Sequence, residues 1–206
     1  MKNDTATVMV VDDDSGVRNA MRVLLRSVGL NCILYASAKE FLEAYQPSQT
    51  GCLVLDIRMP GMSGLELQEE LNKRGAVIPV IFMSGHGDIP MAVEAMQLGA
   101  FDFLQKPFRD QDLLDRIQRA IAKHLELRKS LSEHDRIRGR LDELTPRERE
   151  VLDYLTQGKQ NKAIAQELDV SPRTIEIHRA RVMEKMGAQS VAELVRMMLE
   201  LKRADR

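Results

Sequence analysis

The chain has 206 residues, enough for two small domains, and its 44% hydrophobic and 30% charged residues are typical of a folded chain rather than a disordered one. Aromatic residues make up only 4% and Trp is absent, which argues against a base-stacking surface for single-stranded nucleic acid. The formal net charge is −1, so the overall charge does not point to nucleic acid.

Neither a membrane segment nor a disulfide is expected. No apolar run approaches the roughly 18–20 residues of a membrane span, and the first residues lack the apolar core of a signal peptide. We therefore expect a cytoplasmic protein. Cys32 and Cys52 lie in apolar, strand-like runs without Cys or His at ligand spacing, which favours buried thiols over a disulfide or metal site.

The charge is divided unevenly along the chain. Residues 1–122 carry 12 Lys and Arg against 16 Asp and Glu, whereas residues 123–140 carry 6 against 3 and residues 141–206 carry 12 of each. An acidic first part and a basic connection indicate two domains with different roles. Any contact with DNA must then come from local patterning.

The first 122 residues alternate five short apolar runs with five amphipathic segments of helical length. The central apolar runs contain few polar residues, as expected of strands buried on both faces. Because right-handed helical crossovers join parallel strands, we expect an α/β doubly wound fold with sheet order 2-1-3-4-5 and helices on both faces. The expected strands are Thr7–Val11, Asn31–Ala36, Cys52–Asp56, Ile78–Met83 and Phe101–Leu104, and the expected helices are 15–28, 38–46, 64–73, 88–98 and 110–122.

Residues 123–142 predict a charged helical linker that continues the last helix of the first domain. A solvated connector explains this pattern. A coiled-coil dimer seam is the alternative, although the stretch is shorter than the three or four heptads that such a seam needs. Its scattered apolar residues are Leu125, Leu131 and Ile137, and its histidines, His124 and His134, are expected on the solvated face.

Residues 143–206 predict a second domain of four helices. Thr145-Pro146-Arg147-Glu148 is a capping box with Pro at the first helical position, and Gly158 ends that helix. A short helix, a tight turn and a longer capped helix follow, which is the spacing of a helix-turn-helix. These further helices are Asn161–Leu168, Pro172 to about Met186 after the Ser171 cap, and a fourth that begins near Ser190 and Glu193.

Acidic and basic side chains follow three of the expected strands. Asp12 and Asp13 come after the first strand, Asp56 ends the third, and Lys106 follows the fifth. Because the carboxyl ends of parallel strands face the same side, these three carboxylates and the ammonium are expected to converge. Clustered carboxylates imply a cation, and hard oxygen donors suit Mg²⁺ beside a phosphate. A carboxylate there can act as a nucleophile toward a phosphoryl group, with Lys106 and Ser84 stabilising the transferring oxygens.

Other interpretations of the same residues compete with this one. An acidic pair can cap the first helix and Asp56 can form a turn, but the four residues Asp12, Asp56, Ser84 and Lys106 at four strand ends favour a site. The three consecutive aspartates also fit the loop of a Mg²⁺-dependent aspartyl-nucleophile phosphatase, although the fifth position is Gly16 and Asp56 then has no role. A dinucleotide site at residues 85–90 is weaker because Pro replaces the third small residue. His86, in that loop, is expected to be a solvent-facing or hinge residue.

The third helix of the second domain has an apolar stripe and an opposite face. The stripe that should pack into the domain consists of Ile175, His178, Val182 and Met186. On the opposite face, Ile177 beside Ala180 suits a major groove, where methyl groups meet thymine, while an ordinary amphipathic helix is the plainer alternative. The residues expected to contact DNA are Asn161 and Lys162, through phosphates, and Arg173, Thr174, Glu176, Ile177, Ala180, Arg181 and Lys185.

Two sets of motifs resemble known families. VVDDD, LVLDIRMPGMSG, FMSGHGD and LQKPF resemble the receiver domain of bacterial two-component response regulators. LTPREREVL, GKQNKAIAQEL and SPRTIEIHRARVMEKM resemble the LuxR-type helix-turn-helix. The whole chain is similar to the NarL/FixJ family, its FixJ-like branch in particular. This predicts a receiver domain at residues 1–122, a helical linker at 123–142 and a DNA-binding domain at 143–206.

The resemblance implies roles for individual residues. Asp56 would be the phosphoacceptor, and Asp12 and Asp13 would be the acidic pair that holds Mg²⁺ with Asp56 and the backbone carbonyl of Arg58. Ser84 and Phe101 fit the switch positions, where a hydroxyl and an aromatic ring respond to the phosphoryl group. Lys106-Pro107 resembles a peptide that is often cis in the family.

The resemblance also implies partners. These are a sensor histidine kinase, double-stranded promoter DNA, RNA polymerase and, after phosphorylation, a second copy of the chain. The chain would not be an enzyme beyond its own phosphoryl transfer and dephosphorylation; the phosphatase is the alternative. The fourth helix of the second domain often forms the dimer contact, which here would use Leu194, Val195, Met198 and Leu201, although hydrophobic core is their commoner use.

Overall fold

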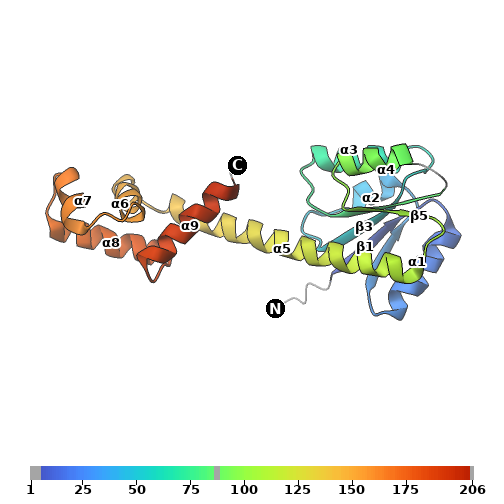
Figure 1. Cartoon of the computed structure of the whole chain (residues 1–206), viewed down its shortest axis with the longest axis horizontal. Helices are drawn as coiled ribbons and strands as arrows, with labels where there is room; N and C mark the ends of the chain where they lie inside the picture. Colours follow the sequence, from blue (N-terminus) through green and yellow to red (C-terminus); the bar gives the residue numbers. More distant parts are fainter. Residues whose placement is uncertain (1–5, 86–88, 205–206) are drawn as a thin grey trace. The chain divides into compact units, whose positions relative to one another are not determined.

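The computed structural model describes residues 6–85 and 89–204, and the chain divides into two compact units, residues 1–127 and 128–206 (Figure 1). His86 lies outside the described residues. In the described part of the chain, no helix combines the length and the apolar character that a membrane span requires. Cys52 is buried and Cys32 partly buried, both as free thiols.

The first unit contains a five-stranded parallel sheet in the order β2-β1-β3-β4-β5, which confirms the predicted topology. Because every strand is parallel, the carboxyl ends of all five strands lie at the same edge of the sheet. The strands are β1 (Thr7–Val11), β2 (Asn31–Tyr35), β3 (Gly51–Asp56), β4 (Val80–Ser84) and β5 (Asp102–Gln105).

Helices cover both faces of this sheet (Figure 1). Successive strand residues point to opposite faces, so Val8 and Val10 of β1 pack against α1 and α5 while Met9 and Val11 pack on the other side, against α2, α3 and α4. The sheet therefore lies between two apolar layers, one on each face. The helices are α1 (Ser15–Ser27), α2 (Ala38–Ala44), α3 (Gly64–Lys73), α4 (Ile89–Gln97) and α5 (Asp110–Asp142).

Several strand boundaries differ from the predicted ones by one or two residues, and two of these differences have clear local reasons. β4 begins at Val80 rather than Ile78 because Pro79, which has no N–H, precedes it. β3 begins one residue early, at Gly51, where a Cβ atom would lie 1.8 Å from the carbonyl oxygen of Thr7. Only glycine allows this close approach between β3 and β1.

The expectation that His124 faces solvent is wrong. Its side chain is 1% exposed, and Nδ1 lies 2.7 Å from the carbonyl oxygen of Gly51. The turn of α5 that carries His124 therefore still packs against the start of β3, inside the first unit. His134, also expected to be solvated, is half-buried.

The second unit consists of the last turns of α5 and four further helices. Capping contacts confirm the predicted starts of two of these helices: Thr145 and Glu148 form the capping box of α6, and Ser171 caps α8. Ile137 of α5 belongs to the core of this unit. The helices are α6 (Pro146–Thr156), α7 (Asn161–Glu167), α8 (Pro172–Met186) and α9 (Val191–Ala204).

Candidate functional site

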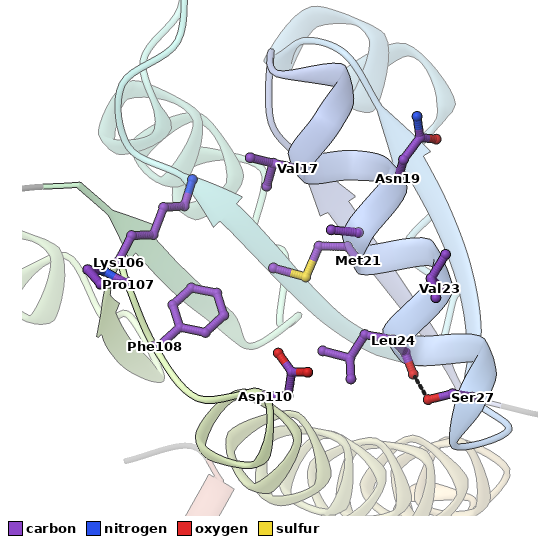
Figure 2. A pocket seen from close by; sticks show the side chains of 11 residues that line it. Val17, Asn19, Met21, Val23, Leu24, Ser27, Lys106, Pro107, Phe108 and Asp110 are labelled. Atoms are coloured by element: carbon purple, nitrogen blue, oxygen red, sulfur yellow. Dashed lines mark hydrogen bonds between the residues drawn. The ribbon is translucent and has the colours of Figure 1, made fainter.

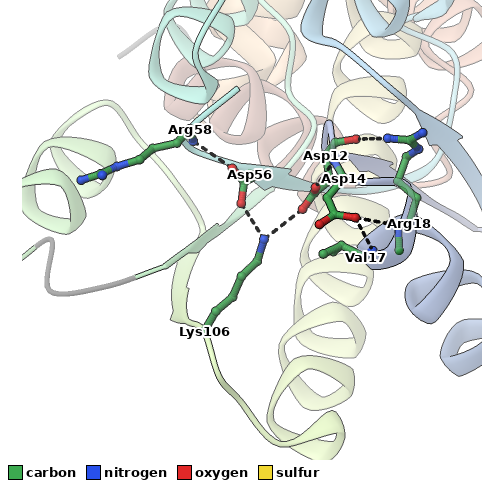
Figure 3. A network of polar contacts seen from close by, with 8 residues as sticks. Asp12, Asp14, Val17, Arg18, Asp56, Arg58 and Lys106 are labelled. Atoms are coloured by element: carbon green, nitrogen blue, oxygen red, sulfur yellow. Dashed lines mark hydrogen bonds and ion pairs between the residues drawn. The ribbon is translucent and has the colours of Figure 1, made fainter. Parts of the chain in front are cut away.

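Two carboxylates and one ammonium meet at the carboxyl edge of the sheet (Figure 3). Asp12 follows β1, Asp56 is the last residue of β3, and Lys106 follows β5. The Nζ atom of Lys106 donates to Asp56 Oδ1 at 2.6 Å and to Asp12 Oδ2 at 2.9 Å. Both carboxylates are buried, so one cation partly neutralises two anions in a poorly hydrated place.

Backbone and side-chain donors hold the two carboxylates in place. The N–H of Asp14 donates to Asp12 Oδ1 at 2.9 Å, and the N–H of Arg58 donates to Asp56 Oδ2 at 2.9 Å. The guanidinium of Arg18, in α1, donates to the carbonyl oxygen of Asp12 at 2.7 Å. Arg18 therefore fixes the backbone that presents Asp12 to the site.

The third carboxylate expected at the site, Asp13, does not converge with the other two. Asp13 is exposed, and the part of the chain that the structure describes holds no ready cluster of three potential metal-ligating side chains. Consecutive residues of an extended segment point to opposite sides, which separates Asp13 from the buried Asp12. Asp14 serves the first helix instead, since its Oδ1 accepts from Gly16 N at 2.7 Å as the N-cap of α1.

Of the remaining receiver residues singled out in the sequence, Ser84 and Pro107 lie at this edge of the sheet, whereas Phe101 does not. Ser84 is 2% exposed, and its carbonyl oxygen accepts from the N–H of Lys106 at 2.7 Å. Phe101 precedes β5, and its N–H donates to the carbonyl oxygen of Val80, the first residue of β4, so it lies at the opposite, amino edge of the sheet. Its half-buried side chain packs against the core beneath α1 and α5, which does not support the predicted switch role. The Lys106-Pro107 peptide is cis, as predicted.

Burial and charge act in opposite directions on the ionisable groups of the site. Burial raises the pKa of Asp56, and the nearby charge of Asp12 raises it further. The hydrogen bond from Lys106 and the Lys106 charge lower this pKa, but the net shift is upward. Burial alone would lower the pKa of Lys106, but its hydrogen bonds to Asp56 and Asp12 raise this pKa overall. Asp56 is therefore more basic than an ordinary carboxylate and faces a firmly held cation.

The loop after β3 closes tightly over the back of Asp56. At Gly64, the first residue of α3, a Cβ atom would lie 2.3 Å from the carbonyl oxygen of Asp56. The N–H of Gly64 also donates to the carbonyl oxygen of Ile57 at 2.9 Å. Gly64 was not among the residues predicted from the sequence, although its place eight residues after Asp56 and directly after the Ser63 cap was a usable signal.

The donor set of the site fits Mg²⁺. Mg²⁺ is usually held by one or two carboxylates together with waters and phosphate oxygens, so the pair Asp12 and Asp56 is sufficient protein ligation. Lys106 offsets only one of their two charges, and the upward pKa shift of Asp56 reflects the burial and the neighbouring negative charge. A divalent cation would relieve this repulsion.

An open, largely apolar pocket of about 710 Å³ lies beside the cluster (Figure 2). It is formed by α1 and by the connection between β5 and α5, and Lys106 is one of its lining residues. Val23, 71% exposed, presents an apolar side chain to solvent in this lining. The other apolar lining residues include Val17, Met21, Leu24, Pro107 and Phe108.

The predicted DNA-reading helix is α8, and it has the predicted two faces. Ile175, Val182 and Met186 are fully buried in the core of the second unit, and His178 is half-buried at its edge. Ile177 is 49% exposed, as an apolar side chain that enters a groove would be. The other exposed residues of the predicted surface are Lys162, Arg173, Glu176, Ala180 and Arg181, while Asn161 and Thr174 are half-buried.

The predicted role of Lys185 in DNA contact is not supported by its surroundings. Its Nζ atom lies 2.7 Å from Glu148 Oε2 and 3.1 Å from the carbonyl oxygen of Glu143. Helical spacing placed Lys185 on the flank beside Arg181, but the spacing did not show that Glu148 of α6 lies opposite it. Lys185 holds α8 against α6.

The apolar residues of α9 divide between core and surface. Leu194 is fully buried and Leu201 is 6% exposed, so both belong to the core. Val195 and Met198 are half-buried, and Leu199 is 52% exposed. Only part of the predicted dimer face is therefore available on this helix.

Comparisons with known families and proteins agree with this geometry. The family model of the response regulator receiver domain matches residues 8–118, and the model of the bacterial regulatory proteins of the luxR family matches residues 142–198. The chain is a two-component response regulator of the NarL/FixJ family. The regulator joins a receiver domain to a LuxR-type DNA-binding domain, which makes it a phosphorylation-dependent transcriptional regulator.

Individual relatives cover nearly the whole regulator. The transcriptional regulatory protein FixJ of Azorhizobium caulinodans is 48% identical over 95% of this chain and 93% of its own length, and the response regulator protein TmoT of Ectopseudomonas mendocina is 43% identical over 98% and 92%. Among solved structures, the response regulator StyR has a TM-score of 0.89 at 45% identity, covering 95% of this chain and 99% of that one. The names of these relatives all describe regulators.

Proposed function

We propose that Asp56 accepts a phosphoryl group from a sensor histidine kinase and that the new charge promotes dimerisation and promoter binding. The observation that carries this proposal is the contact of Lys106 Nζ with Asp56 at 2.6 Å and with Asp12 at 2.9 Å, which supports a charged nucleophile at a cation-binding edge. Since its DNA target lies in the cytoplasm of a bacterium, we place the regulator there.

The transfer uses the basicity of a buried carboxylate. An oxygen of Asp56 forms a bond to phosphorus while the bond from phosphorus to the kinase histidine nitrogen breaks, and that nitrogen leaves with the electron pair. Lys106 compensates the negative charge of the transferring oxygens. The N–H of Arg58, which donates to Asp56 Oδ2, orients the attacking group.

We propose that Asp12, Asp56 and the backbone carbonyl of Arg58 hold Mg²⁺, and that Asp13, which lies apart from them in the structure, turns toward the cation when it binds. When bound, Mg²⁺ supplies positive charge that neutralises the phosphoryl oxygens and the clustered carboxylates. Asp12 is already held at the site by Asp14 and Arg18. Asp13 is exposed on the same loop, and Lys106 Nζ contacts Asp12 rather than Asp13.

The signal passes from the new phosphoryl group to the surface of α4 and β5. Ser84 and Lys106 end neighbouring strands and share a backbone hydrogen bond, so a shift of either moves the other. A hydroxyl bond from Ser84 to a phosphoryl oxygen draws the end of β4 toward the site, and β5, whose Phe103 packs in the core shared with α4, moves with it. The surface formed by α4 and β5 is thereby repacked, and we propose that it dimerises.

The apolar pocket beside Lys106 is the surface on which we place the kinase. The pocket borders the site through Lys106, and Val23 exposes an apolar side chain at its wall. Val23→Glu should slow phosphotransfer from a sensor kinase and leave labelling by acetyl phosphate, which needs no docking surface, unchanged. Equal loss with both donors would reject this placement.

We propose that α8 enters the major groove of promoter DNA. Ile177, Ala180 and Arg181 would contact base edges, and Asn161 and Lys162 would contact phosphates. Lys162→Ala should weaken binding to all sequences alike, whereas Ile177→Ala should change the preference among them. A uniform effect of Ile177→Ala would contradict its placement in the groove. RNA polymerase is proposed as a further partner on the same promoter.

Labelling with a small phosphodonor tests the central proposal. Acetyl phosphate carrying radioactive phosphorus should label the regulator stably in Mg²⁺ and should not label Asp56→Asn. Asp14→Asn, which changes the α1 cap instead, should still be labelled. Multiple turnover on phosphate esters would instead favour a Mg²⁺-dependent aspartyl phosphatase.

A further inference from the structure

Arg179 of α8 and Asn161 of α7 form a contact that the proposed DNA surface does not explain. The guanidinium NH1 of Arg179 donates to Asn161 Oδ1 at 3.2 Å. Arg179 lies four residues after Ile175 and three before Val182, on the side of α8 that packs into the domain rather than on its groove face. Both side chains of the pair are half-buried.

The chemistry of this contact fixes the orientation of the Asn161 amide. A guanidinium has only donors, so the oxygen of the amide must face Arg179 and the nitrogen must face away. Within the described part of the chain, Asn161 Nδ2 makes no hydrogen bond. Its two N–H donors are therefore available to an acceptor from outside the chain.

The charge of Arg179 indicates the sign of that acceptor. No carboxylate of the described residues lies within ion-pair distance of its guanidinium, although a half-buried cation is ordinarily paired. Lys162, next to Asn161, is an exposed second cation. The position thus combines two positive charges with a pre-oriented amide donor, which suits a phosphate of the DNA backbone.

We propose that Arg179 is a positioning residue that holds the Asn161 amide for a hydrogen bond to a DNA phosphate. This inference rests on the proposed DNA surface of α7 and α8. It assigns the phosphate contact to Asn161 Nδ2 and gives Arg179 a role through Asn161 rather than a direct contact. Because phosphates carry no base identity, the pair sets affinity for every sequence.

Binding of the full-length regulator to a fluorescent duplex of unselected sequence at low salt tests this role. Arg179→Met keeps the apolar stem but removes the donor, and it should weaken binding about fivefold, as should Asn161→Ala. The double variant should be no weaker than either single variant, because both changes remove the same bond. Arg179→Lys, which keeps a donor, should recover part of the affinity.

The salt dependence separates positioning from direct contact. Loss of a direct contact between a cationic side chain and a phosphate reduces the magnitude of the slope of log affinity against log salt by about 0.9, so Lys162→Ala should do this. Arg179→Met should change the slope by clearly less than Lys162→Ala does. An equal fall in slope, or additive effects in the double variant, would overturn the positioning role.

Two controls distinguish failure of the Arg179 role from failure of the proposed DNA surface. If Lys162→Ala and Arg181→Ala leave DNA binding unchanged, the proposed surface is wrong and the role of Arg179 falls with it. If both weaken binding and Arg179→Met does not, only the role of Arg179 is wrong. Hydrogen exchange of the α7 and α8 amides shows whether Arg179→Met leaves the helices folded. If Arg179→Met unfolds them, the double-mutant comparison is repeated with Arg179→Lys and Asn161→Ala. Additive effects of these two substitutions on DNA affinity would then overturn the positioning role.

Discussion

The burial of Asp56 disfavours its charged form, so replacing it with a neutral residue should stabilise the receiver. Its pKa is raised above the ordinary value of about 3.9. A raised pKa in the folded state contributes stability below the unfolded pKa and loses it as the pH rises through the folded pKa. At pH 7 the ionised carboxylate is therefore destabilising, and Asp56→Asn should raise the receiver's unfolding midpoint on the order of 5 °C.

Scanning calorimetry without Mg²⁺ measures this effect of Asp56→Asn. The advantage of the variant should shrink as the pH falls below about 4, where Asp56 is protonated in both states. Asp13→Asn, at an exposed carboxylate, should change the midpoint little at any pH. A midpoint for Asp56→Asn below that of the unmodified chain at pH 7 would show that its ion pair with Lys106 outweighs burial.

Arg18 should control the affinity of the receiver for Mg²⁺ without touching the metal. Its guanidinium holds the carbonyl oxygen of Asp12 at 2.7 Å, so Arg18→Ala should loosen the backbone that presents this carboxylate. Outer partners of metal ligands typically change metal affinity 10–100-fold, and we expect about a tenfold rise in half-saturating Mg²⁺ for acetyl phosphate labelling. The maximal rate at high Mg²⁺ should recover.

Arg22→Ala, an exposed substitution one turn along α1, is the matched control for Arg18→Ala. It should leave the Mg²⁺ dependence unchanged. A low maximal rate for Arg18→Ala at every Mg²⁺ concentration would assign Arg18 to the transfer itself.

The sequence predicted which strand ends carry the site but not which aspartate does what. Asp12, Asp56 and Lys106 were predictable because parallel strand ends must share one edge. The division of labour among Asp12, Asp13 and Asp14 depends on where α1 begins and which way each backbone unit points. Both follow from the folded backbone and not from the residue types.

Between elements, the ion pair of Glu148 and Lys185 fastens α8 to α6 and should make the second unit sensitive to acid. The hydrogen bond from Lys185 and the backbone N–H of Thr145 lower the pKa of Glu148 to about 2. A depressed pKa contributes stability above the unfolded value of about 4.3 and loses it as the pH falls toward 2. Glu148→Gln should lower this unit's unfolding midpoint by about 5–10 °C at pH 7.

Unfolding midpoints measured at several pH values test whether the Glu148–Lys185 ion pair causes this destabilisation. Calorimetry of the second unit's transition should show that the difference in unfolding midpoint between Glu148→Gln and the unmodified chain disappears between about pH 4 and pH 2. Glu150→Gln, at a solvent-exposed pair with Arg147, should show almost no effect. A constant difference at all pH values would mean that the amide disturbs the α6 cap and not the charge pair.

Among the helices and strands, the features that could be predicted were those that depend on residues close together in the sequence. The starts of α6 and α8 followed from their capping residues, and the strands from their apolar runs. Contacts between elements were not encoded locally: Glu148 lies 37 residues from Lys185, and His124 lies 73 from Gly51. Helical periodicity gave the face of each residue but not the partner on it.

For the whole molecule, the motifs predicted both families because each motif fixes a turn or site at a defined strand or helix end. The exposed surface that joins two copies is less constrained by such motifs. Val93 and Met96 of α4 are 51% and 49% exposed, which makes α4 the part of the proposed dimer surface where apolar side chains reach solvent. A substitution there can separate phosphorylation from its consequence.

Val93→Arg should uncouple dimerisation from phosphorylation. With Mg²⁺ and beryllofluoride, a phosphoryl mimic, the unmodified regulator should become a dimer and bind paired DNA half-sites about 100-fold more tightly, because the second module binds at high effective concentration. Val93→Arg should remain monomeric, since like charges meet across the two-fold axis, and its DNA affinity should stay at the unphosphorylated level. Sedimentation and fluorescence anisotropy measure the two effects.

Labelling of Val93→Arg by acetyl phosphate should be unchanged, because α4 contributes no group to the contacts of Asp56 and Lys106. Val77→Arg, at a 38% exposed position between α3 and β4, should dimerise and bind DNA like the unmodified chain. If Val93→Arg dimerises normally with beryllofluoride, the two copies meet through another surface. If it stays monomeric yet gains full DNA affinity, phosphorylation acts on each chain separately and effective concentration is not the source of the gain.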